Sequence, residues 1–157
     1  MTRDTDQLNR SPVHLLHRAG QCAEEIFQGE MPGDVTPRQL AVLMTVAQNE
    51  ELSQTGIIDA TGIDRSTLAE IVRRLVKRKL LQRRRTREDA RAYAVKLTDE
   101  GWRALRTAEP VAKRVDERVL DALPARHREQ FVAALLAIVK TLDVMAPEGK
   151  QQARRAA

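Results

Sequence analysis

Basic side chains gather in one segment of the sequence, where they could bind a polyanion. Residues 65–91 include eleven Lys or Arg and three acidic residues, so this segment carries a net charge of +8. The whole chain carries +5, which leaves −3 for all other residues together. A basic segment in an otherwise acidic chain is typical of a nucleic-acid-binding surface, although many charge runs are only solvated helix faces.

The spacing within this segment divides it into a helix and a hairpin. Residues 65–79 place apolar side chains at i, i+3, i+4, i+7 and i+8 from Leu68, which predicts an amphipathic helix. The first turns of such a helix can reach base edges in a major groove of double-stranded DNA. The charged residues 83–91 precede an alternating run at 93–97, which predicts a β-hairpin with a charged tip. The candidate DNA-binding residues are Arg65, Ser66, Thr67, Glu70, Arg73, Arg74, Lys77, Arg85, Arg87, Asp89 and Arg91.

Different roles are expected within this set. Arg73 could donate two hydrogen bonds to guanine, whereas Arg74 and Lys77 are expected to contact phosphate only. Arg87 and Arg91 at the hairpin tip suit a narrow minor groove, and Asp89 can hold the tip by bonding its backbone amides. A simple Asp89–Arg91 pair in the free protein is compatible with that role.

A second group of chemically capable residues lies in the first expected helix. His14, His17, Arg18 and Cys22 stand there among leucines and alanines. A guanidinium beside imidazoles and apolar side chains suits an anion with an apolar body, such as an aromatic carboxylate or its thioester. The same residues could instead decorate a dimer interface. Two histidines do not complete a metal site, and we expect Cys22 to pack rather than to sense oxidants, so neither metal nor cofactor is expected.

The composition and the missing motifs exclude several classes of protein. Aromatic residues make up only 3%, which disfavours the stacking platforms of single-strand binders. No apolar stretch approaches the roughly 20 residues that a membrane span needs. No nucleophile elbow, phosphate-binding loop or paired-carboxylate motif is present, so we expect no enzymatic activity. One cysteine and a polar N-terminus predict a cytoplasmic protein.

The elements that must position the basic helix begin and end at recognisable caps. Ser53 and Asp64 cap two short helices, and Gly62 between them can take the left-handed conformation that ends the first helix. Two short helices joined by a tight turn, the second basic outside, are typical of a helix-turn-helix. A further helix capped by Thr36 precedes them. We therefore expect residues 36–98 to form a winged helix-turn-helix domain.

The flanking segments are expected to build a dimer. Residues 11–28 and 99–145 carry apolar stripes at helical spacing that have no role in a minimal DNA-binding domain. Symmetric dimers are the commonest assembly, and they place recognition helices about 34 Å apart on successive major grooves. Residues 1–10 and 146–157 are expected to be disordered tails. The expected fold is mostly α with a small β-hairpin wing (α+β): a winged helix-turn-helix with N- and C-terminal dimerisation helices.

Five segments, in order and at consistent spacing, resemble the MarR family of bacterial transcriptional regulators. They are TPRQLAVL from residue 36, GIDRSTL from 62, LLQR from 80, DARAY from 89 and LTDEG from 97. The resemblance covers roughly residues 11–145. It implies an obligate homodimer that binds a near-palindromic operator, usually as a repressor, and is released by a small molecule. The resemblance further implies an aromatic acid, a phenolic or a related acid, bound between the dimerisation helices and the winged domain.

Two positions depart from the family pattern. Ala90 stands where the family often has Arg between Asp89 and Arg91, which keeps the Asp–Arg pair but weakens contacts to the DNA backbone. Lys79 stands where many members have Gly, and we expect this change to be neutral because Lys only extends the basic patch.

Two other functions account for parts of the sequence. An architectural DNA-binding protein without sequence preference would need only the basic surface. Glu70 on the recognition face favours base reading instead, because an acid there lowers phosphate affinity. A protein-interaction adaptor that has lost DNA binding would not need the net charge of +8. A ligand-responsive transcriptional regulator is therefore the leading hypothesis.

Overall fold

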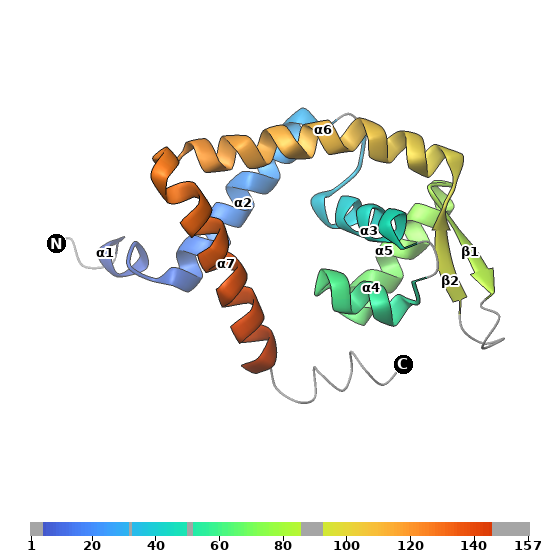
Figure 1. Ribbon diagram of the computed structural model, residues 1–157, viewed down its shortest axis with the longest axis horizontal. Coiled ribbons are helices and arrows are strands. Elements are labelled where there is room, and N and C mark those ends of the chain that lie inside the picture. Colours follow the sequence, from blue (N-terminus) through green and yellow to red (C-terminus); the bar gives the residue numbers. More distant parts are fainter. Residues whose placement is uncertain (1–4, 32, 50–51, 86–92, 146–157) are drawn as a thin grey trace.

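The protein consists of a winged domain under one end of a long helix and a helical pair at the other end (Figure 1). The computed structural model describes residues 5–31, 33–49, 52–85 and 93–145. The elements are α1 (Thr5–Leu8), α2 (Pro12–Glu30), α3 (Pro37–Gln48), α4 (Gln54–Thr61), α5 (Arg65–Lys77), β1 (Leu81–Arg85), β2 (Tyr93–Leu97), α6 (Asp99–Asp121) and α7 (Ala125–Met145).

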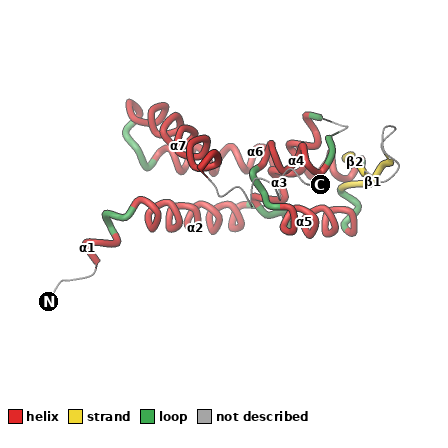
Figure 2. The backbone as a smooth tube through the Cα atoms, turned by 90° about the horizontal axis from the view of Figure 1, so that it is seen from below, coloured by secondary structure: helices red, strands yellow, loops and turns green. Residues whose placement is uncertain are grey.

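This order confirms the expected fold class, mostly helical with one β-hairpin wing. Seen from below, α2 and α7 lie at the end of the molecule opposite to the hairpin (Figure 2). The helical turn α1 lies within the N-terminal segment that we expected to be a disordered tail, and it differs from that expectation. The expected C-terminal tail, residues 146–157, lies outside the described residues.

One hydrophobic core holds the winged domain together. Leu43 of α3, Ile57 of α4 and Leu68 of α5 are fully buried, and they meet Val95 of β2 and Leu105 of α6 in the same cluster. Burial of such side chains stabilises the fold by roughly 1.5–3 kcal/mol each. The core therefore fixes α5 by its apolar side and leaves the opposite side of that helix at the surface.

The helix starts follow the predicted caps. The Thr36 hydroxyl accepts a hydrogen bond from the backbone N–H of Gln39, and the Gln39 side chain accepts one from Thr36, both at 3.2 Å. Asp64 caps α5 by accepting from the backbone N–H of Thr67 at 3.0 Å. Gly62 has φ +68°, the left-handed value expected for the residue that ends α4. These contacts confirm that the turn between α4 and α5 is specified locally.

The end of α5 differs from its prediction. The helix stops at Lys77, and Lys79 adopts a left-handed conformation with φ 59°. The backbone N–H of Leu80 then bonds the carbonyl of Leu75 at 2.9 Å, and that of Lys79 bonds the carbonyl of Val76 at 2.9 Å. This is a Schellman ending, which favours glycine at the left-handed position. Our expectation that Lys79 is a neutral replacement for Gly is wrong, because its backbone conformation disfavours residues with a side chain.

The wing is a two-stranded antiparallel hairpin. Its register pairs Leu81 with Leu97 and Arg85 with Tyr93. Leu81 at the start of β1 and Val95 and Leu97 of β2 are buried, whereas Arg83 and Arg84 further along β1 are exposed. The base of the wing is therefore anchored in the core, and these basic side chains lie outside it.

The start of α6 is locked to the base of the wing. The Thr98 hydroxyl donates to the carbonyl of Lys79 and accepts from the backbone N–H of Gly101 at 3.0 Å. The backbone N–H of Thr98 donates to the carbonyl of Leu80 at 3.2 Å. A Cβ on Gly101 would lie 2.1 Å from that same Leu80 oxygen, so only glycine allows the approach. These contacts join the end of α5, the first strand and α6 at one point.

The helices outside the winged domain make fewer buried contacts than those inside it. Glu30 at the end of α2 pairs with Arg114 at 3.7 Å and with Arg118, both on α6. Phe27 is buried in the same region. By contrast, no residue of α7 is buried, and apolar side chains such as Leu136 and Leu142 are more than half exposed. Within the described residues, no helix is long and apolar enough to cross a membrane.

Candidate nucleic-acid interface

The outer face of α5 presents a basic surface. Its apolar residues, Leu68 to Leu75 at helical spacing, point into the core and fix the helix about its axis. Thirteen residues at about 1.5 Å per residue make a helix of about 20 Å, long enough to lie in a major groove. The exposed residues of α5 are Arg65, Ser66, Ala69, Arg73, Arg74 and Lys77, and the half-buried polar ones are Thr67 and Glu70. The structure therefore leaves all the helical members of the predicted DNA-binding set exposed or half-buried at the surface of α5.

The N-cap of α5 is a carboxylate that accepts hydrogen bonds from the first turn of the same helix. Asp64 accepts from the backbone N–H of Thr67 at 3.0 Å and from the Ser66 hydroxyl at 2.7 Å. The bonds from Thr67, and then the bond from Ser66, hold the pKa of the Asp64 carboxyl well below its ordinary value. The Ser66 hydroxyl is thus already engaged in the free protein, and it must turn away from Asp64 to donate to a base.

An acidic residue organises the arginines in the middle of α5. Glu70 accepts from the Nε and Nη2 of Arg73, each at 2.8 Å, and from the Nε of Arg74 at 2.7 Å. The bonds from Arg73, followed by the bond from Arg74, lower the pKa of Glu70 to about 2. The same contact raises the pKa of Arg73. All three side chains remain in contact with solvent, so the cluster is available to DNA.

The sequence analysis missed the exposed basic residues at the base of the wing and included others that the structure does not describe. Arg83 and Arg84 of β1 are exposed beside the recognition helix, and only their charge could have singled them out. Arg78 is also basic, but its guanidinium donates to the carbonyl of Asp34 at 2.8 Å and so ties α5 to the loop before α3. The side chain of Arg85 and the predicted tip residues Arg87, Asp89 and Arg91 lie outside the described residues.

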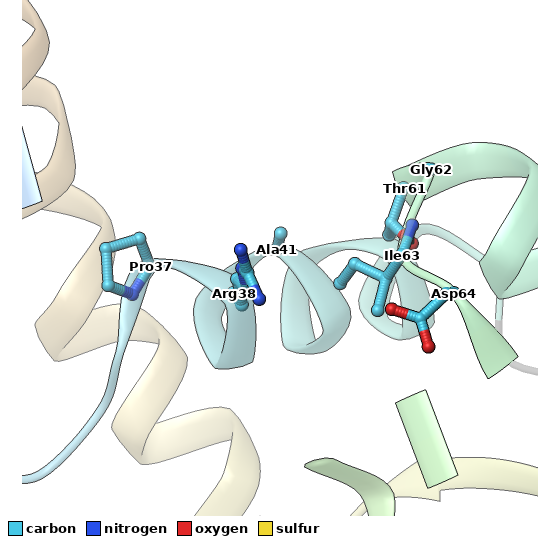
Figure 3. Close-up of a pocket in the computed structure, with 7 residues that line it drawn as sticks. All are labelled: Pro37, Arg38, Ala41, Thr61, Gly62, Ile63 and Asp64. Atoms are coloured by element: carbon cyan, nitrogen blue, oxygen red, sulfur yellow. Dashed lines mark hydrogen bonds between the residues drawn. The ribbon is translucent and has the colours of Figure 1, made fainter. Parts of the chain in front are cut away.

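A surface cavity of about 380 Å³ borders the tip of α5 (Figure 3). Pro37, Arg38 and Ala41 of α3 line one side, and the turn of residues 61–64 lines the other. Arg38 is exposed on its rim, and the sequence analysis did not select this residue. The cavity places a further cation in the lining of a hollow that reaches Asp64, the cap of the recognition helix.

The predicted ligand-binding residues lie along α2. His14, Arg18 and Cys22 follow one another at intervals of four, and Arg18, Cys22 and His17 are exposed. An apolar cavity of about 320 Å³ lies between α2 and α7, but none of the four residues lines it. Its lining residues are Pro12, Leu15, Leu16, Ala19, Phe131, Ala134, Leu135 and Ile138. The structure thus gathers the four residues on one helix without enclosing a ligand site, and their role stays a prediction.

A search of the described residues finds no three His, Cys, Asp or Glu side chains that converge to hold a metal ion.

Comparison with known proteins agrees with this arrangement. A profile described as the MarR family matches residues 33–92, which span α3 to the wing. The chain is 33% identical to the transcriptional regulator HosA of Escherichia coli O157:H7 over 134 residues, which cover 85% of this chain and 98% of HosA. The similarity therefore extends over the flanking helices as well as the winged domain.

Solved structures show the same architecture. The ligand-bound PcaV transcriptional regulator of Streptomyces coelicolor superposes with a TM-score of 0.80 at 31% identity, over 85% of this chain and 94% of PcaV. BpsR of Bordetella bronchiseptica, whose DNA binding is regulated by 6-hydroxynicotinic acid, gives 0.73 at 30% identity, over 80% and 96% of the two chains. The repressor CouR bound to a 23-mer DNA duplex gives 0.77 at 29% identity, over 85% and 95%. CouR has also been solved with p-coumaroyl-CoA.

Proposed function

Because the chain belongs to the MarR family of transcriptional regulators, we propose that it is a homodimeric, sequence-specific repressor that a small anionic aromatic molecule releases from a near-palindromic DNA operator. The observation that carries this proposal is the outer face of α5, where exposed hydroxyl, guanidinium and ammonium groups that suit bases and phosphates share one helix. CouR, which has the same fold, has been solved on a DNA duplex. The helix and the wing supply the two parts that a winged domain inserts into DNA grooves.

The proposed dimer explains the apolar surface that one chain leaves open. Exposed apolar side chains concentrate on the start of α2 and along α7, for example Leu15, Leu136 and Leu142. Patches of this kind on a single chain mark interaction sites. A second copy would cover them by the same surface on both chains, which is the geometry of a twofold dimer. A twofold dimer in turn matches a near-palindromic operator.

The proposed effector follows from chemistry on α2 and from the ligands of similar proteins. Arg18 supplies a cation, and His14 supplies a donor on the same face of the helix. Neighbouring Leu15 and Ala19 supply apolar surface. These groups suit an aromatic carboxylate or its thioester, and BpsR and CouR respond to or bind molecules of these two kinds. The partner chain would have to close this site, because one chain leaves the residues open to solvent.

Release from DNA requires the effector to prefer one arrangement of the dimer. A ligand shifts an equilibrium only by its differential affinity for the two states. Binding beside α2 would favour a spacing of the two recognition helices that no longer matches successive major grooves. The same coupling makes operator DNA weaken effector binding by an equal factor.

The test is a salt-titrated binding assay on two duplexes. One duplex is selected from a random library by the protein itself, and the other has random sequence. We expect the selected duplex to bind about 10³-fold more tightly or better, as specific DNA-binding proteins do. Benzoate, hydroxybenzoates, hydroxycinnamates and their CoA esters are then added to the specific complex. Equal affinity for the two duplexes would contradict sequence-specific binding, and a panel that neither releases DNA nor raises Tm would contradict the effector class.

A further inference from the structure

We propose that Glu70 determines the sequence selectivity of the recognition helix by holding Arg73 and Arg74 away from DNA phosphates. This inference rests on the proposed function, since it concerns how the same face of α5 reads DNA. It assigns to a single carboxylate the task of suppressing binding to DNA of the wrong sequence.

The geometry shows which donors the carboxylate occupies. Glu70 takes the Nε and Nη2 of Arg73 in a two-bond contact, with both distances at 2.8 Å. It also takes the Nε of Arg74 at 2.7 Å through the oxygen that receives Nη2 of Arg73. The Nε–Nη2 edge of a guanidinium is one of its two edges that can bind a phosphate in two-bond fashion. For Arg73 this edge is filled by the protein itself.

A phosphate must therefore compete with an internal anion. Non-specific binding depends almost wholly on pairing Lys and Arg with phosphates. On DNA of unmatched sequence, a phosphate can bond the Nε of either arginine, or the Nε–Nη2 edge of Arg73, only if that arginine gives up bonds to Glu70. The carboxylate of Glu70 also stands beside the remaining donors of both arginines and repels the phosphate. Both effects weaken contacts to phosphate.

A guanine in matched DNA needs only the other edge of Arg73. With its Nε–Nη2 edge held by Glu70, Arg73 still has Nη1 and the second hydrogen of Nη2 to donate. That free edge can donate two hydrogen bonds to the O6 and N7 of a guanine, the commonest specific contact in the major groove. Glu70 then acts as a positioning residue, because it keeps its bonds to the guanidinium of Arg73 and orients it while the other edge contacts the base.

The charge of α5 makes an acidic residue here costly unless it has such a role. Residues 65–91 carry a net charge of +8, and Glu70 is the acidic residue within α5 itself. A neutral Gln would keep the helix and would add to phosphate affinity. A purely structural role, in which Glu70 only links successive turns of α5, predicts a change in Tm but no change in how binding depends on salt.

The experiment compares Glu70→Gln with the wild type on the selected and the random-sequence duplexes, by fluorescence anisotropy at several salt concentrations. We expect Glu70→Gln to bind the random duplex about 10-fold more tightly, with a salt slope steeper by about 1–2, because each new phosphate contact adds about 0.9 to the slope. The affinity for the selected duplex should change much less, so the specificity ratio falls about 10-fold.

Two matched variants test the mechanism. Glu100→Gln removes the same charge from an exposed pair with Arg103 at 2.7 Å on α6, outside the recognition helix, and should leave slope and ratio unchanged. In an Arg73→Ala/Arg74→Ala background, Glu70→Gln should have little effect, since Glu70 acts through these two residues. Glu70→Asp keeps the charge and guards against a folding defect of the first variant, and it should retain most of the selectivity.

The outcomes separate this inference from the proposed function. If the wild type shows no preference for any selected duplex, the proposed function fails. If the wild type discriminates but Glu70→Gln and Glu100→Gln behave alike, the proposal for Glu70 is wrong. A Glu70→Gln effect that persists in full without Arg73 and Arg74 would also overturn it, because it would show a general charge effect.

Discussion

At the residue scale, Lys79 shows that a charge pattern does not reveal which backbone conformation a residue must adopt. Among the described residues it is the non-glycine residue with positive φ, at 59°, and it closes the Schellman ending of α5. In sequence it looked like one more cation of the basic patch. Hydrophobic spacing predicts where a helix lies, but the last residues of a helix depend on which carbonyls the following chain satisfies. The position of the left-handed residue therefore had to come from the structure.

Replacing Lys79 by Gly should stabilise the protein. The left-handed conformation costs a residue with a Cβ roughly 1–2 kcal/mol, and the greater freedom of Gly in the unfolded chain offsets about half of this. We expect Lys79→Gly to raise the free energy of unfolding by about 0.5–1 kcal/mol in urea titrations. Lys79→Ala is the matched control, because it removes the same charge but keeps the strain. Equal stabilities of the two variants would contradict the explanation.

Asp64 should make stability depend on pH in acid. Its pKa in the folded state is lowered by the bonds from Thr67 and Ser66, below the unfolded value of about 3.9. A group with a lowered folded pKa stabilises the protein above the unfolded pKa, and this contribution is lost as pH falls through the folded pKa. The charged cap therefore contributes fully at neutral pH.

Two substitutions measure this contribution by chemical denaturation between pH 7 and 3. Asp64→Ala should lower the free energy of unfolding by about 1 kcal/mol at pH 7, as for other lost N-caps. Asp64→Asn should cost less at pH 7, and its difference from the wild type should shrink below about pH 4. Asp59→Asn, an exposed position within α4, serves as the control. A wild-type-to-Asn difference that stays constant down to pH 3 would show that the charge of Asp64 contributes nothing.

At the scale of the elements, the sequence predicts types and starts better than ends and contacts. Thr36, Ser53, Asp64 and Thr98 each cap a helix as their residue types predict, because capping is local chemistry. The buried face of α5 was likewise predictable from the helical spacing of its apolar residues. The pairing of Glu70 with two arginines was not, since opposite charges at i+3 and i+4 allow several partners and the structure alone shows which form.

Gly101 should be essential to the junction of α5, the wing and α6. A Cβ there would lie 2.1 Å from the carbonyl oxygen of Leu80, a backbone atom that cannot move without shifting the strand. We expect Gly101→Ala to lower the free energy of unfolding by about 1–3 kcal/mol, the usual cost of overpacking. Thermal unfolding followed by circular dichroism measures this change.

Gly20 provides the opposite case on α2. It lies inside a helix and nothing stands within 4 Å of the position of an added Cβ. Gly20→Ala should therefore raise the free energy of unfolding by about 0.5–1 kcal/mol. If both alanine variants shift Tm in the same direction, close approach at Gly101 is not what that glycine provides.

At the scale of the whole molecule, the apolar surface of α7 should control assembly. Leu142 is 58% exposed in one chain, so it adds little to the core but would be covered in the proposed dimer. We expect the wild type to sediment at twice the 17.7 kDa of one chain, and Leu142→Glu to shift it toward the monomer by placing a charge in an apolar interface. Met44→Glu, which adds the same charge at an exposed apolar residue of α3, should leave the mass unchanged. A wild type that sediments as a monomer at micromolar concentration would contradict the proposed dimer.

The bonds of Thr98 and the close approach of Gly101 couple the winged domain to the start of α6, a helix of 23 residues. Glu30 ties α2 to the same helix further along. Movement at one end of α6 is therefore passed to the other end. At about 1.5 Å per residue this arm is about 34 Å long, so a tilt of about 5° at one end moves the other by about 3 Å. That displacement equals a whole hydrogen-bond length. A small rotation among the flanking helices would thus move the side chains of α5 by a full hydrogen-bond length, with no change inside the winged domain itself.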